Sequence, residues 1–289
     1  MLVNPAAVVM GFGMAGRMDV QDNALTAHEM LALLGTGRQI SPLSSRFRGF
    51  SLADAYDVAA EVCRLRTARG EKPVGRKIGF TNRAAWSGYG ISGPIWNYVF
   101  DSTVRDMAGN QGQFSLTGFP EPRIEPEIVL HLATAPQLSM NEEELVGCID
   151  WVAHGFEIVH SVFPNWEFAA ADAVAAYGVH SALLLGDRHV ISDETAKWRE
   201  ELSNFTVDLI RVDGVTRSGH ARNVLGGPLK ALRFLVDELA RYPMSQPLDG
   251  GEIVTTGTLT EAMPVVAGES WSTRLRGIDI RGVQLQLQK

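Results

Sequence analysis

Cysteine is scarce in this sequence of 289 residues, which contains only Cys63 and Cys148. The two lie far apart in apolar stretches, and neither belongs to a CxxC motif or to a cluster with histidine. A disulfide framework and a cysteine-based zinc site are therefore not expected. We predict two reduced, buried thiols in a cytoplasmic protein.

Positive charge is also in short supply. Lysine and arginine total 26 against 33 aspartates and glutamates, which gives a formal net charge of −7, and no stretch carries a basic run. This balance argues against nucleic acid or an anionic membrane as a partner. An anionic small molecule is not excluded, because it needs only local positive charge or a metal ion.

No apolar stretch is long enough to span a bilayer. The first twenty or so residues are mostly small and apolar but have no basic beginning and no long unbroken apolar run, so a signal peptide is not expected. We predict a poorly ordered extension over 1–23 and one catalytic domain over 24–289, without internal repeats. No GxGxxG or P-loop motif opens a predicted helix after a predicted strand, so no nucleotide site is expected.

Helices are predicted mainly in the first part of the chain. Thr26 and Glu29 have the spacing of a capping box, which predicts a short helix ending near Gly35 or Gly37. Ser51 and Asp54 predict the beginning of a second helix that stops at Gly70. Later helices are predicted after Asn141, over 168–177 and over 228–241.

Strands dominate the later part. Alternating or apolar runs predict strands over 73–80, 96–100, 125–132, 151–159, 205–212, 253–259 and 271–287. Asp213-Gly214 is a two-residue hairpin signal after one of them. Long connections separate these elements, so the pattern predicts an α+β fold with a large mixed sheet rather than a βαβ repeat.

Two carboxylates stand out in the apolar run 123–130. Glu125 and Glu127 are two residues apart, so in a strand they lie on one face, while Ile124 and Ile128 lie on the other. Glutamates are seldom buried unless they are paired or bind a metal, and two like charges side by side favour a shared cation. A solvent-facing strand edge with two ordinary glutamates is the alternative.

Two further charged residues occur in apolar strands. Glu157 is the candidate third carboxylate, and three carboxylates without cysteine favour a hard cation such as Mg²⁺ or Mn²⁺. Lys77 lies between Gly75 and Gly79, where an apolar setting can lower the pKa of a lysine and let it act as a base or acid. A salt bridge at a strand end is the alternative for Lys77, and the adjacent Arg76 is expected on the opposite face.

At this point the chain resembles a known family. Its motifs, in order, are Arg38-Gln39-Ile40-Ser41-Pro42-Leu43-Ser44, Leu52-Ala53-Asp54-Ala55-Tyr56, Gly75-Arg76-Lys77-Ile78-Gly79-Phe80-Thr81, Glu125-Pro126-Glu127-Ile128, Phe156-Glu157-Ile158-Val159, Asn165-Trp166, Ala171-Asp172-Ala173-Val174-Ala175 and Gly251-Glu252-Ile253-Val254-Thr255-Thr256-Gly257. In this order they are similar to 2-keto-4-pentenoate hydratases, within the fumarylacetoacetate hydrolase superfamily. The resemblance extends from about Ala24 to the C-terminus.

The resemblance implies a mixed β-roll of the fumarylacetoacetate hydrolase C-terminal domain type, with N-terminal helices. It implies Mg²⁺ or Mn²⁺ held by Glu125, Glu127 and Glu157, with Lys77 as the catalytic acid/base. Thr258 is similar to a threonine near the substrate carboxylate. The implied activity is hydration of a 2-hydroxy-2,4-dienoate in aromatic catabolism, by a homo-oligomer, with an enolate stabilised at the 2-oxygen.

The chain also departs from the family pattern. The glycine loop over 89–96 has Ser92 and no acid, and it begins at Tyr89 and ends at Trp96, which favours a bulkier or more aromatic substrate near these two side chains. His180 stands where it can supply the missing acid/base group, although a structural histidine is the alternative. A 4-oxalocrotonate-type decarboxylase, an acylpyruvate hydrolase and a non-catalytic partner of a pathway enzyme therefore remain alternatives.

Overall fold

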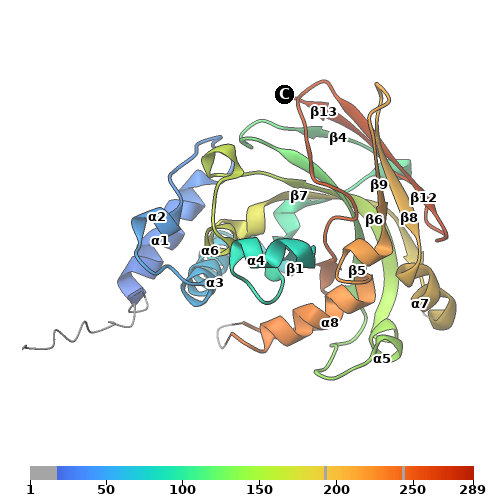
Figure 1. The fold of residues 1–289 in the computed structure, drawn as a ribbon, viewed down its shortest axis with the longest axis horizontal. Coiled ribbons are helices and arrows are strands. Elements are labelled where there is room, and N and C mark those ends of the chain that lie inside the picture. The colour runs from blue at the N-terminus through green and yellow to red at the C-terminus, as the bar shows by residue number, and fades with distance from the viewer. Residues whose placement is uncertain (1–17, 192–193, 243–244) are drawn as a thin grey trace, which may run out of the picture.

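The computed structural model describes residues 18–191, 194–242 and 245–289. Within these ranges the α-helices gather mainly around one side of two curled sheets (Figure 1). The helices are α1 (Val20–Leu33), α2 (Leu43–Arg46), α3 (Leu52–Ala68), α4 (Trp86–Tyr89), α5 (Glu142–Val146), α6 (Ala170–Ala175), α7 (Thr195–Ser203) and α8 (Pro228–Leu239).

The strands fall into two sheets. The larger has the order β2-β1-β10-β5-β6-β7-β3, with β11 also paired to β5, and the smaller has the order β4-β13-β12-β8-β9. Their bounds are β1 (Pro73–Gly79), β2 (Ile95–Phe100), β3 (Val104–Asp106), β4 (Gln111–Ser115), β5 (Arg123–Leu132), β6 (Ile149–Val159), β7 (His180–Val190), β8 (Thr206–Arg211), β9 (Thr216–His220), β10 (Ile253–Thr255), β11 (Met263–Pro264), β12 (Ser270–Arg276) and β13 (Gln284–Gln288).

Both sheets are mixed, and the larger one is the large mixed sheet that the sequence predicts. β1 pairs with β10, β3 with β7 and β4 with β13 in parallel, whereas β5, β6 and β7 form an antiparallel meander. Short hairpins cannot join parallel neighbours, which explains the long connections between strands. The α+β expectation with a large mixed sheet is confirmed.

Three buried clusters hold these layers together. The largest lies between the helices and the larger sheet and includes Met30, Trp96, Ile128 and Leu232. A second joins the two sheets through residues such as Ile124, Phe156 and Trp271. A third, smaller cluster includes Val129 and Leu183. Ile124 and Ile128 are fully buried on the face of β5 opposite the glutamates, as their strand positions predict.

β5 has different neighbours along one of its edges. It pairs with β10 at Val129–His131 and with β11 at Arg123 and Ile124, and Pro126 falls between the two pairings. There the Pro126 carbonyl accepts a hydrogen bond from the Leu259 amide at 2.9 Å. The missing amide of Pro126 faces this same side, because N–H and C=O of one strand residue point the same way. It therefore costs no hydrogen bond to β6.

Helix starts were predicted unevenly. Ser51 caps α3 in a reciprocal box with Asp54, as predicted. The predicted start at Thr26 is wrong, because α1 already begins at Val20 with Asp19 as its cap, and Thr26 lies buried inside the helix. Thr26 and Glu29 show capping-box spacing by coincidence, and Glu29 instead forms an ion pair with Arg46.

The predicted extension over 1–23 lies mostly outside the described residues, and its last residues, 20–23, already belong to α1. Both cysteines are free thiols; Cys148 is buried and Cys63 half-buried. None of the helices in the described part of the chain combines the length and the apolar composition needed to cross a membrane.

Candidate metal and substrate site

β5 and β6 bring the predicted carboxylates together. Their antiparallel register sets Glu125 directly opposite Glu157, and Glu127 is one same-face step further along β5. One carboxylate oxygen from each of the three glutamates lies within 4.8 Å of the others. That spread is close to the separation of oxygens around one hard cation, about twice a metal–oxygen distance of ~2.1–2.5 Å.

The three glutamates are not equally exposed. Glu127 and Glu157 are fully buried, whereas Glu125 is partly exposed and lines a cavity of about 590 Å³. Glu127 Oε1 and Glu157 Oε2 are buried and have no hydrogen-bond partner in the part of the chain that the structure describes. Unsatisfied buried carboxylate oxygens are costly, so two of them within one cluster of glutamates fit the binding of a divalent cation. Oxygen-only donors suit a hard metal.

Each buried glutamate is held in place by its second oxygen. Glu127 Oε2 accepts the Gly257 amide at 2.9 Å. Glu157 Oε1 accepts hydrogen bonds from Lys77 Nζ at 2.9 Å and from His180 Nδ1 at 2.7 Å. His180 Nε2 in turn lies 2.9 Å from the Thr103 hydroxyl. Glu127 Oε1 and Glu157 Oε2, the two oxygens without a partner, therefore belong to side chains that cannot rotate freely.

The charges of the cluster set its pKa values. Burial raises the pKa of Glu125 to about 7 and that of Glu127 well above its usual range. Burial also opposes the ionisation of Glu157, but Lys77 and His180 outweigh it and lower the pKa of Glu157 to about 2. Neighbouring carboxylates whose pKa values are pushed apart are typical of functional sites.

Lys77 differs from the sequence-based expectation in one respect. Burial alone would lower its pKa, as predicted, but Glu157, Glu125 and Glu127 together raise the pKa above its ordinary value. Lys77 is therefore an ammonium group in this arrangement. Arg76 points the other way, as predicted, and forms an ion pair with Glu252 at 3.0 Å.

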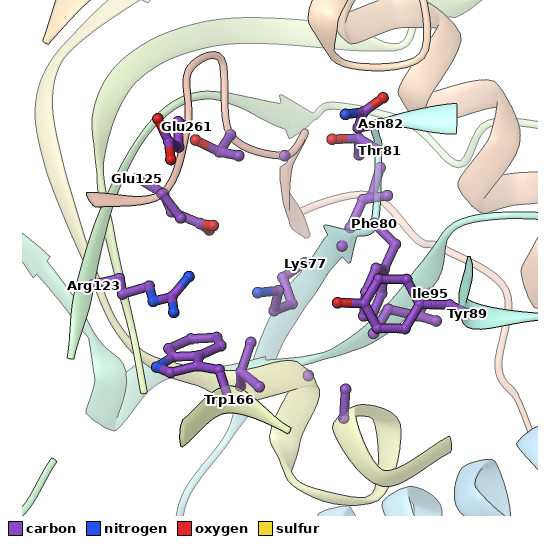
Figure 2. Close-up of a pocket in the computed structure, with 18 of the residues that line it drawn as sticks. Lys77, Phe80, Thr81, Asn82, Tyr89, Ile95, Arg123, Glu125, Trp166 and Glu261 are labelled. Carbon is purple, nitrogen blue, oxygen red and sulfur yellow. The ribbon is translucent and has the colours of Figure 1, made fainter. Parts of the chain in front are cut away.

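The cavity contains some of the predicted residues and not others. Lys77, Glu125 and Thr258 line it, and Figure 2 shows Lys77 and Glu125 pointing into the same space. His180 is buried and reaches Glu157 without lining the cavity. Ser92 is not among the lining residues either.

Trp96 also does not line the cavity. It packs in the core, stacked on Tyr56 with ring centroids 4.8 Å apart. All six residues of β2 are buried, so alternation gave no guide to which side chains face the cavity. Ile95, its neighbour, lines the cavity instead, together with Tyr89 from α4.

Sequence reasoning did not select two residues at the cavity, Arg123 and Trp166. Arg123 is two residues before Glu125 in the same strand, so the period of two that paired the glutamates also places Arg123 on their face. Trp166 follows Asn165 at the end of a short 3-10 helix, Pro164–Trp166, and Trp166 and Asn165 have positive φ angles of 59° and 61° respectively. The periodicity of helices and strands cannot predict which way the side chains of such a segment point.

The chain has curated relatives over most of its length, although no family model matches it. It is 30% identical to 2-keto-4-pentenoate hydratase 2 of Dechloromonas aromatica, covering 86% of this chain and 91% of the relative. It is 26% identical to 2-hydroxyhexa-2,4-dienoate hydratase of Comamonas testosteroni, covering 87% and 92%. A 4-oxalocrotonate decarboxylase of a Pseudomonas species is 28% identical, covering 73% and 80%.

Solved structures share the fold. The 4-oxalocrotonate decarboxylase of Pseudomonas putida G7, complexed with magnesium and adipate, superposes with a TM-score of 0.84 at 24% identity, covering 94% of this chain and all of that one. A yeast fumarylacetoacetate hydrolase family protein gives 0.53 at 14% identity, covering 74% and 92%. The fold is thus that of the fumarylacetoacetate hydrolase superfamily. With 30% identity to a curated hydratase over most of both sequences, the chain belongs to the 2-keto-4-pentenoate hydratase family.

Proposed function

We propose that this protein is a divalent-metal-dependent hydratase of a 2-hydroxy-2,4-dienoate, of the kind formed in aromatic catabolism. The observation that carries the proposal is the convergence of Glu125, Glu127 and Glu157, with two buried oxygens lacking any partner. The names of the hydratase relatives supply the reaction class. The cation is Mg²⁺ or Mn²⁺, and we expect a cytoplasmic homo-oligomer.

In this proposal the three glutamates hold the cation. When bound, the cation would act as a Lewis acid that favours negative charge on the substrate 2-oxygen. Lys77 faces the same cavity and carries a proton on Nζ, so it can deliver that proton to the substrate chain and take one back. Glu157 fixes the position of Lys77 through the 2.9 Å contact.

His180 is assigned a positioning role. It does not line the cavity, but its Nδ1–H holds Glu157 Oε1, and the ring is fixed on its other side by Thr103. A histidine that fixes a carboxylate in this way maintains the geometry of the ligand and of Lys77 together. Thr258 lines the cavity and is assigned to the substrate carboxylate.

The ligand assignment is tested by calorimetry with Mg²⁺. Glu125→Gln removes a charged oxygen that lines the cavity, so Mg²⁺ affinity should fall by roughly 10- to 100-fold or more. Glu261→Gln is the matched control, because Glu261 lines the same cavity but pairs with Arg217 outside the cluster. Unchanged Mg²⁺ affinity in Glu125→Gln would refute the site.

The reaction is tested by incubating the Mg²⁺-loaded protein with 2-hydroxy-dienoates and 2-oxo acids and identifying products by NMR. We expect water addition to the distal carbon. Release of carbon dioxide would favour the second candidate, a 4-oxalocrotonate-type decarboxylase, which one of the relatives supports. A cleaved acyl product would indicate a hydrolase, and no turnover at all would favour a partner subunit.

A further inference from the structure

Arg123 has an unused guanidinium group at the cavity. Its side chain lines the cavity, and its Cζ atom lies 4.1 Å from the centre of the Trp166 ring. Within the described ranges, this ring contact is its one direct partner; no carboxylate or carbonyl is bonded to the guanidinium. Figure 2 shows Arg123 pointing toward the space that Lys77 and Glu125 also face. Five donors are thus available to a ligand.

Trp166 is held under Arg123 by a strained segment. Trp166 has a φ of 59°, and Glu121, which it contacts, has a φ of 47°. The Trp166 indole donates to the Glu121 carbonyl at 3.0 Å, and the Glu121 carboxylate accepts the Asn165 amide at 2.9 Å and Gln39 Nε2 at 2.8 Å. Backbone strain kept in place by several contacts is typical of binding sites.

The position of Arg123 indicates which end of a ligand it meets. Glu127, Glu157 and Lys77 are at most 2% exposed, so the proposed cation lies at the deep end. Arg123 and Trp166 are half-buried, and Arg123 is one same-face step along β5 from Glu125, about 7 Å away. A ligand whose acid group is bound at the deep end would therefore present its remote end to Arg123.

The charges nearby favour an anion at this remote end. Lys77 is already paired with Glu157, and Glu261, the other carboxylate lining the cavity besides Glu125, is paired with Arg217. Glu125 attracts the Arg123 guanidinium through space, but among the described residues no carboxylate is bonded directly to that guanidinium. A planar guanidinium lying against an aromatic ring suits two-pronged binding of a carboxylate.

We propose that Arg123, held against Trp166, binds a second carboxylate at the end of the substrate remote from its 2-oxo or 2-hydroxy acid group. The substrate class is then a dicarboxylate rather than a dienoate with a hydrocarbon end. This inference rests on the proposed function, because it takes the deep end of the cavity as the place of the acid group that the metal binds.

The test uses two probes that differ only at the remote end, 2-oxoadipate and 2-oxohexanoate. Binding to the Mg²⁺-saturated protein is measured by calorimetry. We expect 2-oxoadipate to bind about 10- to 100-fold more tightly, as for a charge-assisted pair of hydrogen bonds. Arg123→Gln should abolish this preference and leave 2-oxohexanoate affinity within about twofold. Arg123→Lys should retain part of it.

Arg105→Gln is the matched control. Arg105 also lies over an aromatic ring, that of Phe114 at 5.1 Å, but it is exposed and does not line the cavity. Arg105→Gln should retain the full preference for 2-oxoadipate over 2-oxohexanoate. Thermal unfolding of each variant separates a lost contact from a misfolded chain, and Arg123→Lys serves if Arg123→Gln does not fold.

Three results would overturn the inference. Equal affinity of the wild type for both probes would show that no remote carboxylate is recognised. Equal losses for both probes in Arg123→Gln would place the guanidinium at the common acid group instead. In either case the proposed function survives, since Mg²⁺-dependent binding of 2-oxo acids persists. Binding of Mg²⁺ but of neither probe would refute the proposed function, and the inference with it.

Discussion

Glu157 is the residue through which the buried charges of this protein are connected. One of its oxygens accepts both Lys77 and His180, while the other has no partner. A side chain with one satisfied and one free oxygen is fixed in direction and still available to a ligand. Glu127 has the same arrangement, with the Gly257 amide in the fixing role.

Sequence reasoning identified these charged residues because each is out of place in an apolar strand. Glu125, Glu127, Glu157 and Lys77 all stood in runs where burial of a charge needs an explanation. It could not foresee the sign of the pKa shift at Lys77, which depends on three carboxylates from two other strands. Arg123 was within reach of the same reasoning but was not selected.

A buried histidine gives a prediction for stability at acidic pH. His160 is 2% exposed, its Nδ1 has no partner, and burial lowers its pKa to about 4 from 6.5. Between pH 6.5 and pH 4, His160 is therefore protonated in the unfolded chain and neutral in the folded chain. This difference costs about 1.4 kcal/mol of unfolding free energy per pH unit down to pH 4.

The check compares wild type with His160→Gln by urea unfolding. The stability difference in favour of the wild type should shrink by roughly 3 kcal/mol between pH 7 and pH 4, because only the wild type carries this penalty. A difference that stays constant across this range would show that His160 is protonated in the folded state.

At the scale of elements, the pairing of β5 with β6 accounts for much of the site. The sequence predicted both strands, and the register that sets Glu125 opposite Glu157 came only with the structure. For β5 the sequence predicted which residues lie on which face, because the charged residues occupy one face only. It could not be predicted for β2, where every residue is buried and Trp96 proved to be a core residue.

The turn after β10 offers a test of how the elements hold the glutamates. Gly257 has a φ of +100°, and a Cβ there would lie 2.5 Å from Thr81 Cγ2, so Gly257→Ala forces the backbone to move. Its amide should then leave Glu127, and Mg²⁺ affinity should fall by about 10- to 100-fold.

Gly251→Ala is the control for backbone strain alone. Gly251 has a similar φ of +89°, but nothing lies within 4 Å of a Cβ there. It should lose about 1–2 kcal/mol of stability and keep its Mg²⁺ affinity. Calorimetry on both variants decides the matter; equal Mg²⁺ affinities in the two would argue against a positioning role for the Gly257 amide.

For the whole molecule, the proposed cation would connect the central strands of the larger sheet. Its ligands come from β5 and β6, and the residues that fix them come from β1, β7 and the turn after β10. The mixed sheet and its helical cover could be predicted from periodicity and from the family resemblance. In the smaller sheet the sequence signals only the hairpin of β8 and β9, through Asp213-Gly214. The pairings of β4 with β13 and of β8 with β12 could not be predicted, because they join strands that are distant in sequence.

Metal addition should therefore stabilise the whole fold. At a Mg²⁺ concentration 100 times the dissociation constant, mass action adds about 2.7 kcal/mol to the unfolding free energy. For a chain of this size that raises Tm by about 5–10 °C, as seen by calorimetry or circular dichroism. EDTA should reverse the rise, and Glu125→Gln should show a much smaller rise at the same Mg²⁺ concentration, because its affinity for Mg²⁺ is expected to be lower. A Tm insensitive to Mg²⁺ in the wild type would contradict the site.

Pro126 has a consequence for how this enzyme can diversify. Strands β10 and β11 fix β5 on either side of it, and the segment between them, 256–262, includes Gly257, Thr258, Thr260 and Glu261, which line the cavity. Because Pro126 has no amide to pair on this edge of β5, the segment between β10 and β11 need not form a continuous strand. Apart from Leu259, which is buried and donates its amide to the Pro126 carbonyl, residues 258–262 can thus change in sequence and reshape the cavity while the register of the glutamates is preserved.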